Sequence, residues 1–229
     1  MKNFMLTAHR GIFDNKLVIE NTIPAFQNAL LHNLSIELDV KITKDNKLVV
    51  FHDDNLLRMA NENVLIEDLT LEELQSYKLF NTGTIPTLKE VLNLVNCKAL
   101  LDIEIKNTNK IDEITSILIN ELKGYHNFTI KSFNPRIIKK LKKECPSWIY
   151  GLIISAKNKN LYNKILINIY KPDFISIDKK IVNKKYIKKY SLNHNISVWT
   201  IKNKEELILI NNPNYQYICN NLPYEKSIN

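Results

Sequence analysis

The chain has 229 residues, of which 45% are hydrophobic and 24% are charged, and its formal net charge is +8. This length suits one domain of the size of a single α/β barrel, and the composition excludes a disordered or collagen-like chain. The positive charge comes mainly from lysines, with runs at 139–143 and 179–189 that we interpret as solvent-exposed faces of amphipathic helices. This charge is the only feature that would favour binding to nucleic acid, so we expect no nucleic-acid partner.

Short apolar runs of β type alternate with longer segments of helical period along most of the chain. The runs that predict strands are residues 4–8, 35–40, 99–106, 128–133, 148–154, 173–177, 196–201 and 215–219. Strict alternation of strand and helix implies a parallel sheet, and eight such units predict a (β/α)8 TIM barrel formed by residues 1–229 as one domain. An open doubly wound sheet is the alternative, but the chain has four glycines and no glycine-rich phosphate loop after the first strand.

One segment interrupts the alternation. A polar turn at 44–47 and an apolar run at 48–51 predict a hairpin that extends the second strand. Residues from about 54 to 85 then show no clean period, apart from a short capped helix that starts near Leu69. We interpret this stretch as a small insertion after the second strand, where loops of such barrels lie on the catalytic face.

Two carboxylates share one face of the second predicted strand. Glu37 and Asp39 alternate with Ile36, Leu38 and Val40, so both project to one side, which is inward in a barrel. Like charges buried together are costly unless a cation lies between them. The alternative is an ordinary strand with a solvated acidic face.

The third predicted strand repeats this pattern. Asp102, Glu104 and Lys106 share a face, so Glu104 adds a third inward carboxylate and Lys106 an ammonium group. Three convergent carboxylates without nearby cysteine or clustered histidine favour a hard divalent cation, Mg²⁺ or Ca²⁺. An internal ion pair between Glu104 and Lys106 is the alternative.

Two histidines lie at the ends of apolar runs. His9 ends the first strand, and His52 follows the run at 48–51. Side chains of this type beside a cation suit acid–base chemistry at neutral pH, although each alone is equally compatible with a structural role. Arg10 offers a planar fork for phosphate, and together with Lys106 it would surround an anionic substrate.

In order and spacing, these residues resemble the glycerophosphodiester phosphodiesterase family of TIM-barrel enzymes. The motifs that carry the resemblance are His9-Arg10-Gly11, Glu20-Asn21-Thr22, Glu37-Leu38-Asp39, His52-Asp53, Glu104-Ile105-Lys106, Ser132-Phe133-Asn134 and Val198-Trp199-Thr200. No single motif is specific, but the ordered set covers nearly the whole chain.

The resemblance implies a barrel with a small insertion and metal-dependent hydrolysis of glycerophosphodiesters to glycerol 3-phosphate and an alcohol. It implies these roles: metal ligands Glu37, Asp39 and Glu104, acid–base pair His9 and His52, phosphate ligands Arg10 and Lys106, and pocket walls Phe133 and Trp199. We expect a cyclic phosphate intermediate, because attack by the neighbouring glycerol hydroxyl exploits a high effective molarity. The sequence leaves open the headgroup, the choice of cation, and which histidine is acid and which is base.

The sequence departs from the family pattern at three places. Ile19 stands where a proline often precedes Glu-Asn-Thr, and Asn46 replaces the glycine of a tight turn, a position that asparagine tolerates in left-handed geometry. At the third place, Asn220-Asn221 stands where the family usually has Thr-Asp. The loss of that aspartate is expected to change an interaction below the site.

Two alternative functions remain. A lysophospholipase D acting on lipid diesters predicts an apolar surface around the insertion, whereas 54–85 is mostly polar. A non-catalytic barrel that only binds phosphodiesters would not need both histidines and three carboxylates.

Sequence features also bear on the compartment. The three cysteines are widely spaced, with no C-x-x-C pair and no zinc spacing, which indicates free thiols in a reducing environment. No apolar signal core begins the chain, and no run approaches membrane-spanning length. We therefore expect a soluble, cytoplasmic protein without stable membrane insertion, and the sequence gives no signal for an oligomeric state.

Overall fold

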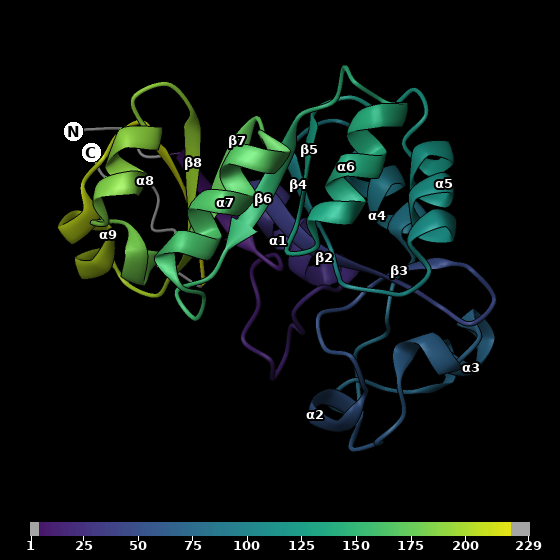
Figure 1. Ribbon diagram of the computed structural model, residues 1–229. Coiled ribbons are helices and arrows are strands. Elements are labelled where there is room, and N and C mark those ends of the chain that lie inside the picture. Colours follow the sequence, from purple (N-terminus) through teal and green to yellow (C-terminus); the bar gives the residue numbers. More distant parts are fainter. Residues whose placement is uncertain (1–4, 221–229) are drawn as a thin grey trace.

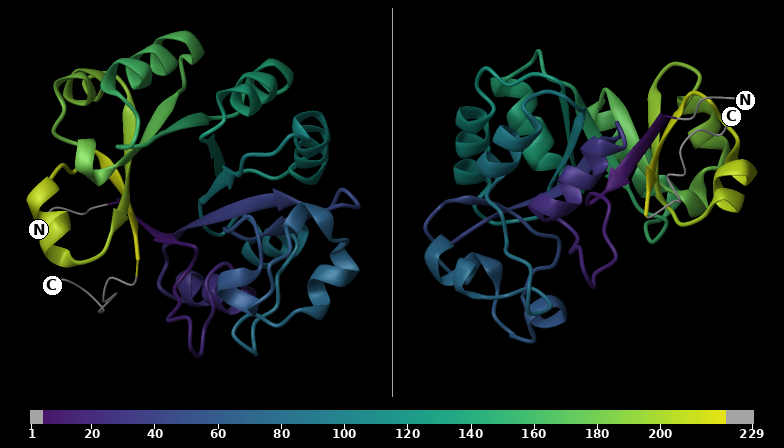
Figure 2. Two further views of the ribbon diagram at one scale, coloured as in Figure 1. Left: turned by 60° about the horizontal axis from the view of Figure 1, so that its bottom comes forward. Right: turned by 180° about the vertical axis from the view of Figure 1, so that it is seen from behind.

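The computed structural model, which describes residues 5–220, contains a closed barrel of eight parallel strands with helices on its outside (Figures 1 and 2). β1 pairs with both β2 and β9, which closes the ring. The barrel strands are β1 (Met5–His9), β2 (Ser35–Ile42), β4 (Leu101–Ile105), β5 (Phe128–Ser132), β6 (Tyr150–Ile154), β7 (Phe174–Asp178), β8 (Asn195–Ile201) and β9 (Tyr215–Cys219). The predicted TIM barrel is therefore confirmed. The predicted start of the first strand, at residue 4, lies outside the described residues.

Helices connect successive barrel strands along the outside of the ring. They are α1 (Ile23–Leu31), α4 (Leu88–Val95), α5 (Ile111–Glu121), α6 (Pro135–Glu144), α7 (Asn160–Tyr170), α8 (Lys185–Tyr190) and α9 (Lys204–Ile210), with a short 3₁₀ helix η2 (Lys179–Ile181) before α8. Pro24 and Pro135 lie in the first turns of α1 and α6, where the missing N–H of proline costs no helical hydrogen bond.

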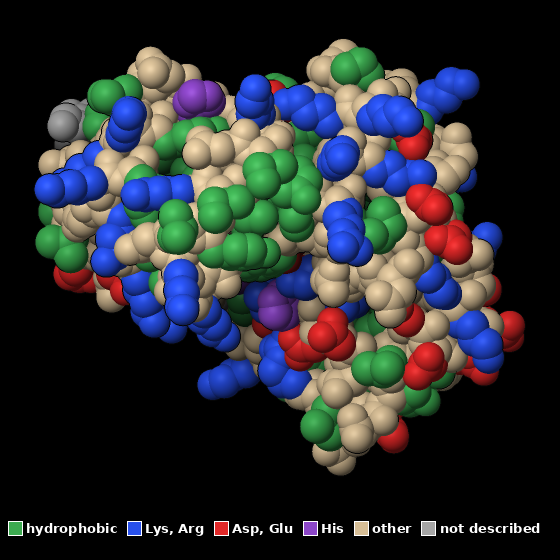
Figure 3. All heavy atoms as spheres, in the orientation of Figure 1, with side chains coloured by type: hydrophobic (Ala, Val, Ile, Leu, Met, Phe, Trp, Pro, Cys, Tyr) green, Lys and Arg blue, Asp and Glu red, His purple; other side chains and the backbone are tan. Residues whose placement is uncertain are grey.

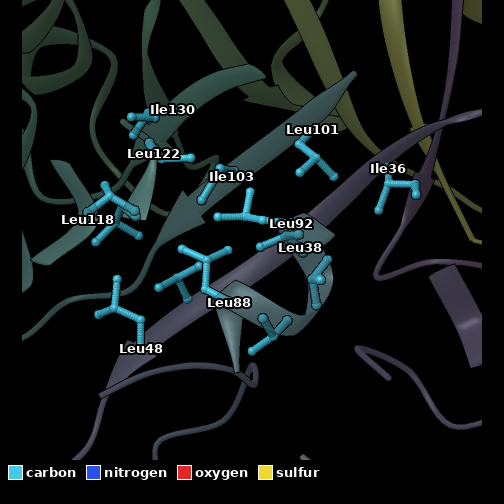
Figure 4. Packing of buried hydrophobic residues seen from close by; sticks show 14 of the residues in the cluster. Ile36, Leu38, Leu48, Leu88, Leu92, Leu101, Ile103, Leu118, Leu122 and Ile130 are labelled. Carbon is cyan, nitrogen blue, oxygen red and sulfur yellow. The ribbon is translucent and has the colours of Figure 1, made fainter. Parts of the chain in front are cut away.

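The apolar core lies between the strands and this ring of helices. Figure 4 shows Ile36 and Leu38 of β2 and Leu101 and Ile103 of β4 beside the apolar face of α4. All four side chains are fully buried. Because side chains alternate across a strand, packing these residues outward against helices directs the acidic residues between them into the barrel.

The predicted hairpin and insertion are present after β2. β2 continues beyond the barrel and pairs antiparallel with β3 (Leu48–Val50), and Asn46 in the turn has a left-handed φ of 59°. The insertion contains α2 (Leu57–Ala60), the 3₁₀ helix η1 (Ile66–Asp68) and α3 (Leu71–Ser76), and it lies below the barrel in Figure 1. Thr70 caps α3 with a capping box, which confirms the predicted short helix.

Register across the barrel brings distant acidic and basic residues to the same level. His9 lies beside Glu37 and Glu37 beside Asp102, while Asp39 lies beside Glu104. The carboxyl ends of parallel strands meet at one end of a barrel, so side chains from β1, β2 and β4 converge there.

Among the described residues, no helix is long and apolar enough to cross a membrane. The three cysteines are free thiols, as the sequence predicts.

Candidate active site

A cavity of about 170 Å³ opens at the carboxyl end of the barrel. Figure 3 shows the corresponding hollow between the barrel and the insertion, with a histidine and charged side chains at its edge. Every predicted site residue except Asp39 lines this cavity, and Asp39 lies beside it within the carboxylate cluster. The residues that line the cavity are His9, Arg10, Glu37, His52, Glu104, Lys106, Lys131, Phe133, Ile153, Ser176, Trp199, Thr200 and Ile218.

Three carboxylates form a buried cluster at the base of the cavity. Glu37, Asp39 and Glu104 each offer an oxygen within 4.8 Å of the other two, and their residues are 2%, 1% and 8% exposed. Burial raises the pKa of Glu104 to about 7, and Asp39 and Glu37 add to this shift against the opposing charge of Lys106. Such a set of oxygen donors, whose mutual repulsion is unfavourable without a cation, fits a divalent ion.

Lys106 contacts this cluster directly. Its ammonium lies 2.7 Å from Glu104 Oε1 and 3.3 Å from Asp39 Oδ1. The ion pair that the sequence offered as an alternative to a cation site is thus present. Although burial acts in the opposite direction, Lys106 and Arg10 hold the pKa of Asp39 well below its usual range. The ammonium therefore offsets part of the negative charge of Asp39 and Glu104.

A second buried cation, Lys131, was not singled out from the sequence. Its ammonium lies 2.6 Å from Asp102 Oδ2 and 3.3 Å from Glu37 Oε1, and the residue is 1% exposed. Contacts with these carboxylates outweigh burial and raise the lysine pKa. The sequence did contain a signal for this residue. Side chains alternate along β5, so the buried, outward-packed Ile130 implies that Lys131 points to the same inner face as the carboxylates.

Arg10 is held by three acidic residues. Its Nη1 donates to Glu20 Oε1 at 2.8 Å, its Nε lies 3.3 Å from Asp39 Oδ2, and its backbone N–H donates to Glu37 Oε2 at 3.2 Å. The residue adopts a left-handed φ of 58°, a conformation that costs a non-glycine residue about 1–3 kcal/mol. Asn21 donates to Asp39 at 2.9 Å from the same loop. These contacts hold Arg10 at the edge of the cavity despite the strained backbone.

His9 contacts the carboxylate cluster from β1. Its Nε2 lies 3.9 Å from Glu37 Oε2, and its Nδ1 hydrogen-bonds the side-chain oxygen of Asn220. Burial lowers the pKa of His9, which favours the neutral ring. Asn220 therefore contacts the site directly, whereas Asn221 lies outside the described residues.

His52 belongs to a chain of ion pairs that leads into the insertion. Its Nδ1 lies 2.7 Å from Asp53 Oδ1, and Asp53 Oδ2 accepts from Arg58 Nε at 2.6 Å. Arg58 also donates to both oxygens of Glu20, at 2.7 and 3.2 Å. Because Glu20 binds Arg10 as well, one arginine of α2 connects His52 to Arg10. We call Arg10, Glu20, Arg58, Asp53 and His52 the bridging network.

Two aromatic side chains face each other across the cavity rim. Phe133 and Trp199 meet edge to face, with ring centroids 6.0 Å apart and planes at 81°. Phe133 is 43% exposed. Trp199 Nε1 and Ser176 Oγ are buried without a hydrogen-bond partner in the described part of the chain. The side of the cavity that contains them therefore also offers polar groups for hydrogen bonding.

Comparison with known proteins places this arrangement in a family. Residues 9–222 match the sequence profile of the Glycerophosphoryl diester phosphodiesterase family. The chain belongs to this family. Glycerophosphodiester phosphodiesterases are phosphoric diester hydrolases, and the chain falls within that class of enzyme.

Individual relatives agree with this placement. A glycerophosphodiester phosphodiesterase of Caldanaerobacter subterraneus is 39% identical over 65% of this chain and 66% of its own length. An uncharacterized protein of Mycoplasma genitalium is 34% identical over 94% of this chain and 95% of its own length. The human lysophospholipase D GDPD1 is 35% identical, over 60% of this chain and 48% of its own length.

Solved structures share the fold. A phosphodiesterase of Oleispira antarctica, determined with the product sn-glycerol-3-phosphate, superposes with a TM-score of 0.84 at 21% identity, over 96% of this chain and 94% of that one. A glycerophosphodiester phosphodiesterase of Thermotoga maritima superposes with a TM-score of 0.79 at 27% identity, over 95% and 94% of the two chains.

Proposed function

We propose that this chain hydrolyses glycerophosphodiesters to glycerol 3-phosphate and an alcohol. The observation that carries the proposal is one cavity lined by two histidines, Arg10 and Lys106 beside a buried three-carboxylate cluster. The Oleispira structure was determined with the product sn-glycerol-3-phosphate, which supports a substrate that contains a glycerophosphate group.

The charges of the site suit a phosphodiester with a single negative charge. Glu37, Asp39 and Glu104 would hold a divalent cation, Mg²⁺ or Ca²⁺, which when bound neutralises charge on a phosphate oxygen. Arg10 and Lys106 bind the remaining phosphate oxygens, and both are held in place by carboxylates. This arrangement stabilises the extra negative charge that develops at phosphorus in the transition state.

The two histidines move the protons. One accepts the proton of the glycerol 2-hydroxyl, whose oxygen attacks phosphorus and forms a cyclic phosphate as the bond to the alcohol oxygen breaks. The other donates a proton to that departing oxygen. In the second step the roles reverse, and water opens the ring to give glycerol 3-phosphate. Both rings are engaged at Nδ1, by Asn220 and by Asp53, which leaves Nε2 of each for proton transfer.

The aromatic pair Phe133 and Trp199 is proposed to bind the carbon skeleton of the substrate. Phe133 and Trp199 would contact glycerol or the headgroup. The indole N–H of Trp199, which has no hydrogen-bond partner among residues 5–220, would donate to a substrate oxygen.

A panel of glycerophosphodiesters, assayed for released glycerol 3-phosphate with and without a chelator, tests the proposal. We expect turnover that requires added Mg²⁺ or Ca²⁺ and that falls by about 10²–10⁴-fold in His9→Ala and in His52→Ala. If either variant kept near-normal turnover, the two-histidine mechanism would be wrong. If the wild-type chain bound diesters without hydrolysing any, it would be a binding barrel.

A second candidate is lysophospholipase D activity. The identity with the human lysophospholipase D and the exposure of Phe133 at the cavity rim favour it. Turnover of glycerophosphocholine compared with lysophosphatidylcholine separates the two activities.

A further inference from the structure

One segment of the barrel carries a concentrated positive charge. Residues 145–204, from just before β6 to the start of α9, contain twelve lysines and no arginine, and their acidic residues are Asp173 and Asp178. The formal charge of this segment therefore exceeds the +8 of the whole chain. Figure 3 shows lysine and arginine side chains around this part of the surface, while acidic side chains gather over the other side and the insertion.

Within this basic region, α7 exposes a stripe of apolar side chains. Leu161, Tyr162, Ile165 and Ile169 are 68%, 51%, 43% and 65% exposed. Their spacing places all four on one flank of the helix, within about 100° of arc at 3.6 residues per turn. Figure 3 shows the hydrophobic side chains gathered over α7 as one patch. Contiguous exposed apolar surface of this kind is typical of an interaction site.

A groove of about 540 Å³ separates α7 from α8 beside the stripe. Lys164, Lys185 and Lys189 line it together with Tyr186 and Tyr190. The Lys164 ammonium lies 5.7 Å from the centre of the Tyr186 ring. Lysines with apolar stems and tyrosines with one polar end suit a boundary between water and an apolar phase.

These features distinguish between possible occupants. A second copy of this chain would bring two lysine-rich faces together, which is repulsive. An anionic phospholipid surface offers negative headgroups to the lysines and an apolar layer to the stripe, and such surfaces attract basic segments by about 1 kcal/mol per lysine. We propose that the face formed by the α7 stripe and the α7–α8 groove docks on anionic phospholipid membranes.

The geometry relates this face to the cavity. α7 follows β6, so its first turn lies at the carboxyl end of the barrel, where the cavity opens. Docking through α7 brings one edge of the cavity mouth to the lipid surface, with no segment inserted across the membrane. The docking is independent of the proposed reaction, because no residue of the face lines the cavity.

Vesicle co-sedimentation tests the proposal. One set of vesicles contains phosphatidylcholine alone and the other an equal mixture of phosphatidylcholine and phosphatidylglycerol. The stripe variant is Leu161→Gln/Ile165→Gln/Ile169→Gln, and the groove variant is Lys164→Gln/Lys185→Gln/Lys189→Gln. A matched control, Lys89→Gln/Lys98→Gln/Lys123→Gln, removes the same charge from exposed positions of the region around α4 and α5.

We expect the wild-type chain to bind the anionic vesicles and not the neutral ones. Binding should fall by at least about tenfold in the groove variant, by a comparable factor in the stripe variant, and by much less in the control. Thermal unfolding and hydrolysis of a soluble diester, measured for each variant, report intact folding. Absence of wild-type binding, equal losses in groove and control variants, or full binding by the stripe variant would each overturn the docking face.

Discussion

Arg58 is the residue whose replacement tests the bridging network most directly. It makes four donor–acceptor contacts of 2.6–3.2 Å to two carboxylates, and through them it connects Arg10 with His52. Arg58→Lys keeps the charge but loses the planar fork that reaches both carboxylates at once. The side chain is 42% exposed, so the change leaves no cavity in the core.

We expect a loss of turnover with little loss of stability. Displacement of reacting groups by about 1 Å can reduce rate by about 10²-fold, and two groups depend on this arginine, so kcat should fall by about 10–100-fold, or about 1.4–2.7 kcal/mol in activation free energy. The free energy of unfolding should change by about 1 kcal/mol or less, as for other partly exposed ion pairs. Because Arg58 does not line the cavity, KM should change less than kcat.

Steady-state release of glycerol 3-phosphate, together with thermal unfolding, measures both effects. Arg136→Lys, at an exposed position of α6, is the matched control and should retain wild-type kcat. Asp53→Asn removes the opposite end of the same contact, so its effect and that of Arg58→Lys should be far from additive. An Arg58→Lys variant with wild-type kcat would show that the network has no part in positioning Arg10 or His52.

Three further predictions concern stability. Arg58 and Arg10 outweigh burial and lower the pKa of Glu20 to about 2, so Glu20→Gln should destabilise the protein by about 2–3 kcal/mol above pH 4.5, and the difference from wild type should vanish as pH falls towards 2 in urea unfolding. A difference that persists at pH 2 would exclude this linkage. Lys131→Met leaves Asp102 and Glu37 buried without their cation and should lower the free energy of unfolding by about 3–5 kcal/mol, with partial recovery when Asp102→Asn is added. A loss below about 1 kcal/mol would contradict the buried ion pair. Gly11→Ala would bring a Cβ to 2.7 Å from the backbone of Ala25. A Cβ added at Gly124, which has a similar φ of 80°, would meet no described atom within 4 Å apart from its own residue and its two chain neighbours. Gly11→Ala should therefore cost clearly more than Gly124→Ala in thermal unfolding, and equal costs would mean that the contact with Ala25 relaxes freely.

The barrel was predictable because its determinants are local. Each strand shows an alternation or an apolar run that the chain itself displays, and eight strands with helices between them leave few topologies. The same alternation directed Glu37, Asp39 and Glu104 inward before any register was known. The placement of Asp39 beside Glu104 follows from that direction together with parallel pairing of β2 and β4.

The partners of these residues were less accessible to sequence reasoning. Lys131 meets Glu37 across β4 rather than from a neighbouring strand, and Asn220 reaches His9 across 211 residues. Contacts of this kind depend on the radius of the closed barrel and on loop conformations, which no local period encodes. Arg58 is the extreme case, because it lies in a segment whose pattern predicted only an irregular insertion.

Ile19 gives a reason for one departure from the family pattern and connects the insertion with the site. The side chain is 2% exposed and belongs to an apolar cluster whose other members, including Met59, Leu79 and Ile85, come from β3, the residue after it and the insertion. A proline at this position would offer less apolar surface to that cluster. Glu20 follows directly, so the same loop is joined to the insertion twice, by apolar packing at Ile19 and by ion pairs between Glu20 and Arg58. The insertion is therefore part of the wall that fixes Arg10, and an insertion exchanged between relatives should preserve turnover only when the residues at 19 and 20 are exchanged with it.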